Sequence, residues 1–176
     1  MSIPSEYSGP AIAEAIDAMV AAMLRRHSDT DSLVVVSIAN GGIQLGECIA
    51  RQLSRATGRD IPTGVVDITF HRDDIGLQPI SKISLPTELP FSIDDTSVIL
   101  VDDVLYSGRT VRAAINELFD QGRPSCIELA VLFHRDETRL PIQPDYFGFR
   151  RKIDSAKTVS LELQPEDPGT AQLVIH

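Results

Sequence analysis

Apolar residues occur along the chain in short runs that alternate with amphipathic stretches, a pattern typical of α/β proteins. Residues 11–26 carry apolar side chains at helical spacing after Pro10 and are expected to form an amphipathic helix. The run Leu33–Ile38 is apolar at nearly every position, which predicts a strand covered on both faces. The chain therefore begins with a helix and a buried strand.

A second helix and a second strand are predicted next, followed by a polar insertion. The helix follows a Gly-rich turn and should end near Gly58, with Ile43, Ile49 and Leu53 as core positions.

Gly64–Phe70 is the second strand, and it leads into residues 71–95, which are polar, contain proline and offer little core material. Long connections of this kind are commonly functional loops. We expect this insertion to act as a mobile hood, or lid, over a site.

The remaining pattern continues the alternation of strand and helix. It predicts a buried strand at Val98–Val101, a helix at residues 110–120, a strand at 126–133, and short strands at Thr158–Leu163 and Gln172–Ile175. The expected fold is a mostly parallel central sheet flanked by helices.

Length and composition bound the organisation of the chain. A chain of 176 residues that is 43% hydrophobic can build one substantial core, so residues 1–176 are expected to form a single domain. The N-terminus lacks the basic-then-apolar layout of a signal peptide, and Glu14 and Asp17 interrupt the apolar stretch 11–24. We expect a soluble cytoplasmic protein without a membrane segment.

Cysteines and histidines suggest no chemistry of their own. Cys48 and Cys126 are far apart and form no metal or redox spacing, so they are expected to be small core residues. His71 and His134 flank the loops described below but have no partners at metal-ligand spacing. No histidine is assigned a catalytic role.

Two adjacent carboxylates, Asp102 and Asp103, follow the apolar run Val98–Val101 and precede a small, hydroxyl-rich turn. Open α/β sheets bind ligands at the carboxyl ends of their strands, so we expect these carboxylates at a site rather than in the core. Ser107 and Gly108 lie at the start of the predicted helix, where free N–H groups and the helix dipole can hold a phosphate. The stretch predicts a site for a sugar phosphate.

The same stretch is not a Walker loop, because it lacks the Gly-x-x-x-x-Gly-Lys spacing. A pair of aspartates can instead accept hydrogen bonds from vicinal ribose hydroxyls and organise a magnesium ion whose other ligands are substrate oxygens and water. The alternative is that Asp102 and Asp103 merely end a strand and that Ser107 caps a helix. The agreement of motif, flanking strand and following helix favours the functional interpretation.

The acids, the turn and the helix together resemble the signature with which type I phosphoribosyltransferases bind 5-phosphoribosyl-1-pyrophosphate (PRPP). The surrounding sequence resembles one subgroup, the PyrR family of pyrimidine-operon regulators and uracil phosphoribosyltransferases. This resemblance extends from about residue 33 to residue 164. Its segments are Asp67–Asp74, Val98–Leu118, Gly122–Ser125, Ile127–Leu132 and Leu140–Ile142, with Asp145, Tyr146 and Gly148.

The resemblance implies the type I phosphoribosyltransferase fold and divides function among three loops. Asp102 and Asp103 would hold the ribose hydroxyls and magnesium, and residues 106–110 would hold the 5-phosphate. The turn at residues 39–42 would hold pyrophosphate, which Arg72 on the insertion would also approach. The implied PRPP-binding residues are Asp102, Asp103, Tyr106, Ser107, Gly108, Arg109, Thr110, Ala39, Asn40, Gly41 and Gly42, with Asp102, Asp103 and Arg72 as the catalytic set.

Both arginines of this set, Arg72 and Arg109, have an alternative interpretation. Arg72 could be a solvated loop residue that pairs with the adjacent acids. Arg109 stands at a helix start, where it could meet phosphate or point into solvent.

The implied reaction converts PRPP and uracil into uridine monophosphate (UMP) and diphosphate, with magnesium as cofactor. It needs no covalent nucleophile, because charge moves from an oxocarbenium-like ribosyl group onto the leaving pyrophosphate, where magnesium and hydrogen-bond donors stabilise it. A homo-oligomer, dimer or larger, is expected from the resemblance. The alternative function is a regulator that senses PRPP or UMP and acts through RNA, with weak or no catalysis.

Two departures from the family pattern affect these expectations. The turn at residues 39–42 contains no cation where the family carries an arginine, so it would bind through backbone N–H groups alone. The stretch Phe149–Asp154 replaces the family's Lys-Asn and Pro-Thr-Ser residues, so uracil specificity is inherited only weakly. The residues expected at the base are Phe149, Arg150, Arg151 and Lys152.

Binding of RNA requires a basic surface that neutralises phosphates, and the charge pattern disfavours it. The formal net charge is −9, and Asp136-Glu137-Thr138 stand where the family has Gly-His-Arg. The first predicted helix gains cations only at Arg25 and Arg26. Residues 150–152 form a short basic run, which is more often an ordinary solvated surface.

Overall fold

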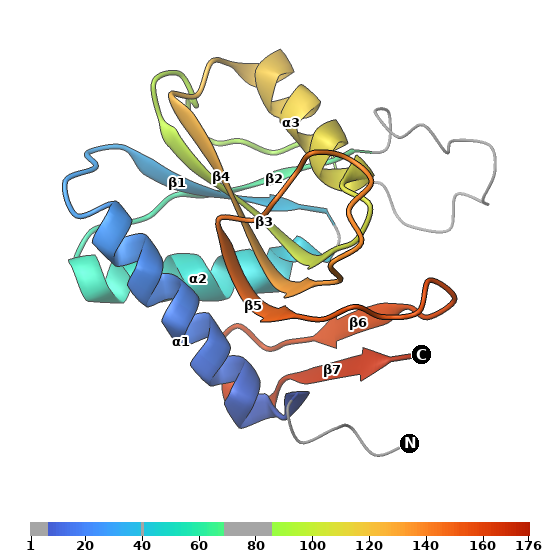
Figure 1. Cartoon of the computed structure of the whole chain (residues 1–176). Coiled ribbons are helices and arrows are strands. Elements are labelled where there is room, and N and C mark those ends of the chain that lie inside the picture. The colour runs from blue at the N-terminus through green and yellow to red at the C-terminus, as the bar shows by residue number, and fades with distance from the viewer. Residues whose placement is uncertain (1–6, 40, 69–85) are drawn as a thin grey trace.

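The computed structural model of the protein describes residues 7–39, 41–68 and 86–176 (Figure 1). Its centre is a five-stranded sheet with the strand order β2-β1-β3-β4-β5, in which every neighbouring pair is parallel. The strands are β1 (Leu33–Ile38), β2 (Thr63–Val66), β3 (Ser97–Leu105), β4 (Cys126–His134) and β5 (Tyr146–Arg150). The expected fold class, a mostly parallel sheet flanked by helices, is confirmed.

Helices cover both faces of the sheet, because the inner strands are apolar on both faces. Figure 1 shows α1 (Gly9–Arg26) and α2 (Gly42–Thr57) on one side and α3 (Arg109–Gln121) on the other. Alternate residues of β1 accordingly enter two cores: Val35 packs with α1 and α2, whereas Val34 and Val36 pack with α3.

A small antiparallel sheet completes the fold at the C-terminal end of the chain. It pairs β6 (Val159–Glu162) with β7 (Gln172–Ile175), and the short helix η3 (Pro168–Thr170) connects them. The two strands pack onto the α1/α2 core through Leu161 and Leu173. The β6–β7 hairpin thereby extends the layer formed by α1 and α2.

Most predicted elements are confirmed, with differences at their ends. β1 has the predicted bounds, and α2 ends at Gly58, whose φ of 68° provides a left-handed cap. β2 is shorter than the predicted strand at Gly64–Phe70, part of which lies outside the described residues. Ile49 and Leu53 are core residues as expected, but Ile43 is only partly buried because it lies in the first turn of α2.

The sequence interpretation missed one strand and underestimated another. β5 was not predicted, because the run Tyr146–Arg150 is short and has Gly148 at its centre. β3 continues four residues past the predicted end at Val101, since β4 runs beside it as far as the pair Leu105 and His134.

The end of the predicted insertion also differs from expectation. Glu88 pairs with Val65 of β2, Leu89 and Phe91 pack against the α3-side core, and Ile93 lies within it, 2% exposed. The prediction that residues 71–95 offer little core material is therefore wrong for this end. The insertion residues up to 85, including Arg72, lie outside the described residues, and the hood stays a prediction.

Both cysteines are unpaired, and Cys48 is buried in α2 while Cys126 is partly buried at the start of β4. Among the described residues, no helix is both long enough and apolar enough to cross a membrane.

Candidate functional site

The topology of the sheet identifies where a ligand should bind. The chain passes from β1 through α2 to β2 on one side, whereas β3 lies on the other side of β1. The strand order therefore reverses between β1 and β3, and in open α/β sheets ligands bind outside the carboxyl ends of strands at such a switch point. The turn at residues 39–42 and the acids of β3 are the segments that meet there.

Asp102 and Asp103 lie within the second half of β3 and not beyond its end. Asp102 pairs in register with Val131 and is 6% exposed, so the expectation that both carboxylates lie outside the core is wrong for Asp102. One carboxylate oxygen, Asp102 Oδ1, accepts a hydrogen bond from the Asp103 N–H at 3.0 Å. Asp103 is partly exposed and its side chain lies on the β1 side of the strand, against Gly41.

The glycines at the end of β1 lie directly against β3. A Cβ atom built on Gly41 would lie 2.5 Å from Asp103 Oδ1, and one built on Gly42 would lie 2.3 Å from the carbonyl oxygen of Val101. Only glycine lets the backbone approach this closely. The structure thus brings the predicted pyrophosphate turn into contact with the predicted ribose acids.

The turn at residues 106–110 joins β3 to α3. Gly108 is the N-cap of α3, with a φ of 86° that favours glycine, and no side chain caps the helix. The Ser107 hydroxyl accepts a hydrogen bond from the Arg109 N–H at 3.3 Å. Arg109 is exposed at the first helical position, and Thr110 follows it, partly buried.

The segment after β4 supports this turn from the outside. The Arg139 N–H donates a hydrogen bond to the Ser107 carbonyl oxygen at 3.0 Å. The side chains of Leu140 and Ile142 lie 3.4 Å from the position that a Cβ on Gly108 would occupy. The segment after β4 thus packs against the turn and supports its conformation.

Helix N-termini provide donors on both sides of the switch point. α2 begins at Gly42 and α3 begins at Arg109, and neither helix has an acidic residue in its first turn. The N–H groups of a first helical turn have no partner within the helix, and the dipole favours anions there. The arrangement can hold two anionic groups, one at each turn, with the carboxylates of β3 between them.

Three of the four residues predicted for the acceptor base have partners within the protein. Phe149 packs edge-on against the Tyr7 ring at 5.3 Å, and Arg151 donates a hydrogen bond to the Tyr7 hydroxyl at 3.3 Å. Arg150 pairs with Asp136 through Nη2 and Oδ1 at 2.6 Å, and Lys152 is exposed. Their assignment to the base stays a prediction.

The pair Arg150 and Asp136 joins two of the segments in which the sequence departs from the family pattern, residues 149–154 and residues 136–138. The guanidinium of Arg150 lowers the pKa of the Asp136 carboxyl, through a hydrogen bond first and through charge second. The pair links the end of β5 to the residues that follow β4.

Sequence reasoning assigned no role to His134 and did not single out Arg135, two buried residues at the end of β4. His134 is 1% exposed, and burial, helped by the nearby Arg150 charge, lowers its pKa. Arg135 is 4% exposed, and its guanidinium lies 4.0 Å from the centre of the Tyr106 ring. The sequence signal that could have identified them is a pair of polar residues directly after the apolar run of β4, the strand that pairs with β3.

Two predicted site residues, Asn40 and Arg72, lie outside the described residues. The described part of the turn, Ala39, Gly41 and Gly42, carries no cation, in agreement with the sequence. Among the described residues there is no cluster of three or more metal-ligating side chains, and the carboxylates at this site are those of Asp102 and Asp103. Such a pair suits magnesium, which commonly takes one or two carboxylates together with substrate oxygens and water.

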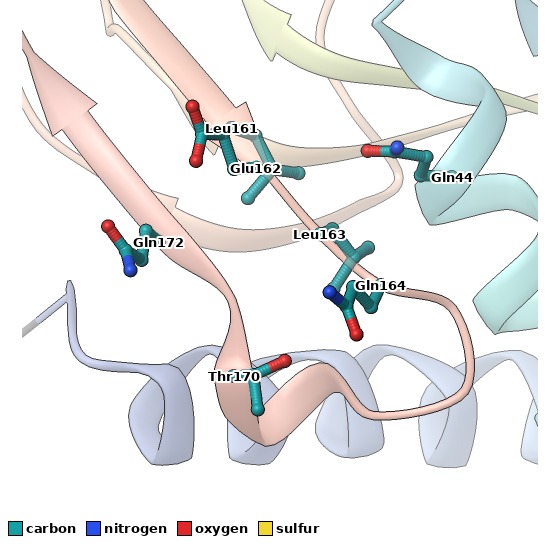
Figure 2. Close-up of a pocket in the computed structure, with 7 residues that line it drawn as sticks. All are labelled: Gln44, Leu161, Glu162, Leu163, Gln164, Thr170 and Gln172. Carbon is teal, nitrogen blue, oxygen red and sulfur yellow. The ribbon is translucent and has the colours of Figure 1, made fainter.

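A separate, polar cavity of about 600 Å³ lies between α2 and the β6–β7 hairpin. Figure 2 shows Gln44 on one side and the hairpin residues on the other. Gln44 stands two residues after Gly42, but none of the predicted site residues lines this cavity. Its lining is Gln44, Leu161, Glu162, Leu163, Gln164, Thr170 and Gln172.

Comparison with known proteins agrees with this geometry. Residues 6–166 match the model of the phosphoribosyl transferase domain family. The "Bifunctional protein PyrR" of Pelotomaculum thermopropionicum is 42% identical over 153 residues, which cover 87% of this chain and 84% of the relative. The protein of the same name from Desulfosudis oleivorans is 44% identical over 156 residues, covering 86% and 84% of the two chains.

Solved structures show the same fold. A hypoxanthine phosphoribosyl transferase of Trypanosoma cruzi superimposes with a TM-score of 0.68 at 17% identity, over 85% of this chain and 77% of that one. The purine phosphoribosyltransferase of Pyrococcus horikoshii gives a TM-score of 0.59 at 27% identity, over 83% and 86%.

Proposed function

Because the chain belongs to the phosphoribosyltransferase family, and within it to the PyrR proteins, we propose that it transfers the phosphoribosyl group of PRPP to uracil. The products are UMP and diphosphate. The observation that carries the proposal is the contact between Gly41 and Asp103, which joins a turn suited to diphosphate and a carboxylate suited to ribose hydroxyls in one site.

The donor would be held at three points. The carboxylates of Asp102 and Asp103 accept hydrogen bonds from the ribose hydroxyls, and the backbone N–H groups at the start of α3 hold the 5-phosphate. The N–H groups at Gly41 and Gly42 hold the diphosphate at the start of α2. The scissile bond then lies between the two helix N-termini, so the reacting groups are oriented before the base attacks.

Charge develops on the leaving diphosphate as its bond to the ribosyl carbon breaks. Donors that point at its oxygens stabilise that charge without having to reorganise. The turn at residues 39–42 supplies such donors from its backbone but no cationic side chain among its described residues. Arg72 is the residue we expect to supply the missing cation from the insertion.

Magnesium fits the site through Asp102 and Asp103, and when bound it would neutralise charge on the diphosphate oxygens. The contribution of the protein is to hold these carboxylates in place. The Asp103 N–H bonded to Asp102 Oδ1, together with the backbone of Gly41 against the Asp103 carboxylate, limits their movement.

A regulatory function is the second candidate, because the relatives are named as bifunctional proteins. Contacts of two described arginines disfavour RNA binding, since their charges already have protein partners. Arg26 pairs with Glu128, and Arg150 pairs with Asp136. With a net charge of −9, this leaves little local positive charge for phosphates.

Steady-state assays with PRPP, magnesium and each nucleobase in turn test the proposal. We expect UMP and diphosphate from uracil. Tight PRPP binding without turnover on any base would favour the sensing regulator. A salt titration of binding to a pyrimidine-operon leader RNA tests that second candidate, because a sequence-selective complex at moderate salt would support it and no affinity at low salt would exclude it.

A further inference from the structure

Unpartnered buried nitrogens gather at one place in the described part of the chain. Within it, the buried side-chain nitrogen and oxygen atoms that have no hydrogen-bond partner are His134 Nδ1, His134 Nε2 and Arg135 Nε. Native proteins contain few such atoms, and each calls for an explanation. Both residues stand at the end of β4, and the Arg135 N–H donates to the carbonyl oxygen of Leu105, directly before the turn at residues 106–110.

The Arg135 side chain connects two segments that are far apart in sequence. Nη1 donates to the carbonyl oxygen of Lys157 and Nη2 donates to that of Asp154, both at 2.9 Å. The flat face of the guanidinium lies 4.0 Å from the centre of the Tyr106 ring. Arg135 therefore fixes Tyr106, the first residue of the turn, against the segment that leads into β6.

The positive charge of Arg135 has no acidic partner in the described part of the chain. Its contacts there are backbone carbonyl groups and an aromatic ring, and it takes part in none of the ion pairs. A cation that is 4% exposed is ordinarily paired with a carboxylate. Since the low dielectric of the interior screens little, this charge favours an anion at the adjacent turn.

We propose that Arg135 is the positioning residue of the 5-phosphate turn: it holds Tyr106 in place and supplies uncompensated positive charge beneath the phosphate of the donor. Arg135 acts through the turn and does not touch the donor. This inference rests on the proposed function, in which residues 106–110 hold the 5-phosphate of PRPP. It adds to the donor site a residue outside the PRPP signature at residues 98–110. It also links residues 154–157, whose carbonyl groups Arg135 binds, to donor binding.

Binding of two ligands, ribose 5-phosphate and inorganic pyrophosphate, distinguishes this role of Arg135 from a merely structural one. Ribose 5-phosphate occupies the turn at residues 106–110, whereas inorganic pyrophosphate occupies the turn at residues 39–42. We expect Arg135→Met to weaken ribose 5-phosphate and PRPP on the order of tenfold, measured by calorimetry with magnesium, because one desolvated cation–π contact and one buried charge are lost. Binding of pyrophosphate should stay within about twofold, a shift that corresponds to under half a kcal/mol.

Two further variants complete the test. Arg135→Lys keeps the charge but loses the planar contacts and should bind ribose 5-phosphate with intermediate affinity. Arg123→Met is the matched control, because Arg123 also donates to two backbone carbonyl oxygens and lies over an aromatic ring, Phe119, but at the other end of α3. Its affinity for all three ligands should equal that of the unmodified protein.

The outcomes distinguish the possibilities. The proposal is overturned if Arg135→Met binds ribose 5-phosphate as the unmodified protein does, or if it loses pyrophosphate affinity by the same factor. If Arg135→Met does not fold, Tyr106→Leu removes the stacking partner from a partly exposed position. It should show the same selective loss, and unchanged binding would overturn the proposal. Failure of the unmodified protein to bind PRPP would instead contradict the proposed function itself.

Discussion

The backbone of Gly41 lies so close to the carboxylate of Asp103 that a methyl group at position 41 would meet Oδ1 at 2.5 Å, Cγ at 2.6 Å and Oδ2 at 2.7 Å. Gly41 lies in the connection from β1 to α2, whereas Asp103 lies within β3. Their contact places the predicted diphosphate turn and the predicted ribose acids in one site.

Gly41→Ala tests this contact directly. Gly41 has a φ of −73° and a ψ of −37°, which alanine adopts without strain, so the substitution changes only the space beside Asp103. The carboxylate must move, and misplacement of this size should lower kcat/KM for PRPP by roughly ten- to a hundredfold. Thermal denaturation should show a folded protein with at most a small loss of stability, because the crowded group is the end of one side chain.

The control for this variant is Gly169→Ala in η3. A Cβ there would meet only Asp167 Oδ1, at 3.3 Å, away from the switch point. Equal kinetics for Gly41→Ala and Gly169→Ala would show that the contact with Asp103 has no part in donor binding.

The double substitution of Asp102→Asn with Asp103→Asn should abolish the donor site while the protein stays folded. Asparagine keeps an oxygen that can accept the backbone N–H of residue 103, so the local hydrogen bond survives. Loss of two charge-assisted interactions should weaken PRPP by at least about a hundredfold in calorimetric titration with magnesium.

A second adjacent pair of aspartates provides the control. Asp94 and Asp95 precede β3 at its amino end, away from the switch point, and Asp94 accepts a hydrogen bond from the Arg123 N–H. Asn substitution of this pair should leave PRPP affinity unchanged. Unchanged affinity in the folded Asp102 and Asp103 variant would refute the assignment of the donor site.

The sequence predicted the strand and helix that flank the donor turn, because their apolar patterns are strong and the signature lies between them. It did not predict the contact of Gly41 with Asp103, because local pattern carries no information on the order of strands in a sheet. The burial of Asp102 was missed for a related reason. It depends on β4 continuing beside β3 to the pair Leu105 and His134, a long-range pairing.

Two residues at the end of β4 show a different limit of prediction from sequence. His134 and Arg135 follow an apolar run in the sequence and resemble the start of an ordinary polar loop. Arg135 is buried by its stacking on Tyr106 and by its bonds to the carbonyl groups of residues 154 and 157, all remote in sequence, whereas the ring of His134 packs against Phe147. Only the tertiary structure reveals that both ring nitrogens of His134 and the Nε of Arg135 have no hydrogen-bond partner among the described residues.

A buried polar cluster of Glu128, Tyr146 and Arg26 lies near the amino ends of β4 and β5, away from the candidate site. Substitutions in it should affect stability alone. Glu128 is 3% exposed, accepts a hydrogen bond from the Tyr146 hydroxyl at 2.5 Å and forms an ion pair with Arg26 Nε at 2.6 Å. Burial and the bond to Glu128 raise the pKa of Tyr146, so the hydroxyl stays a donor. Tyr146→Phe leaves the carboxylate one donor short and should lower the free energy of unfolding by about 1–3 kcal/mol in urea denaturation.

Tyr7→Phe serves as the comparison for Tyr146→Phe. It removes a hydroxyl whose contact with Arg151 is longer, at 3.3 Å, and involves an exposed arginine. The loss should be below about 1 kcal/mol. The KM for PRPP should not change in Tyr146→Phe, and a change would mean that the cluster communicates with the donor site.

His134 should make stability depend on pH below neutrality. Burial disfavours its charged form, so its pKa in the folded protein lies below the value of about 6.5 in the unfolded chain. As pH falls through that value, the unfolded chain takes up a proton that the folded protein does not, and stability falls. Stability from this residue is therefore fully present above about pH 6.5 and declines below it.

His134→Leu should flatten this decline in urea denaturation series between about pH 7.5 and pH 5.5. His176→Gln, at the exposed C-terminal residue, should leave the slope unchanged. Identical slopes for the unmodified protein and His134→Leu would contradict the burial of a neutral imidazole at this position.

The measurement that tests the account most directly is a product assay with PRPP, uracil and magnesium on the unmodified protein and on the Asp102→Asn, Asp103→Asn variant. Our account predicts UMP and diphosphate in equal amounts from the unmodified protein, no product without magnesium, and none from the folded variant. Equal product formation by both proteins, or PRPP binding without product from uracil, would contradict it.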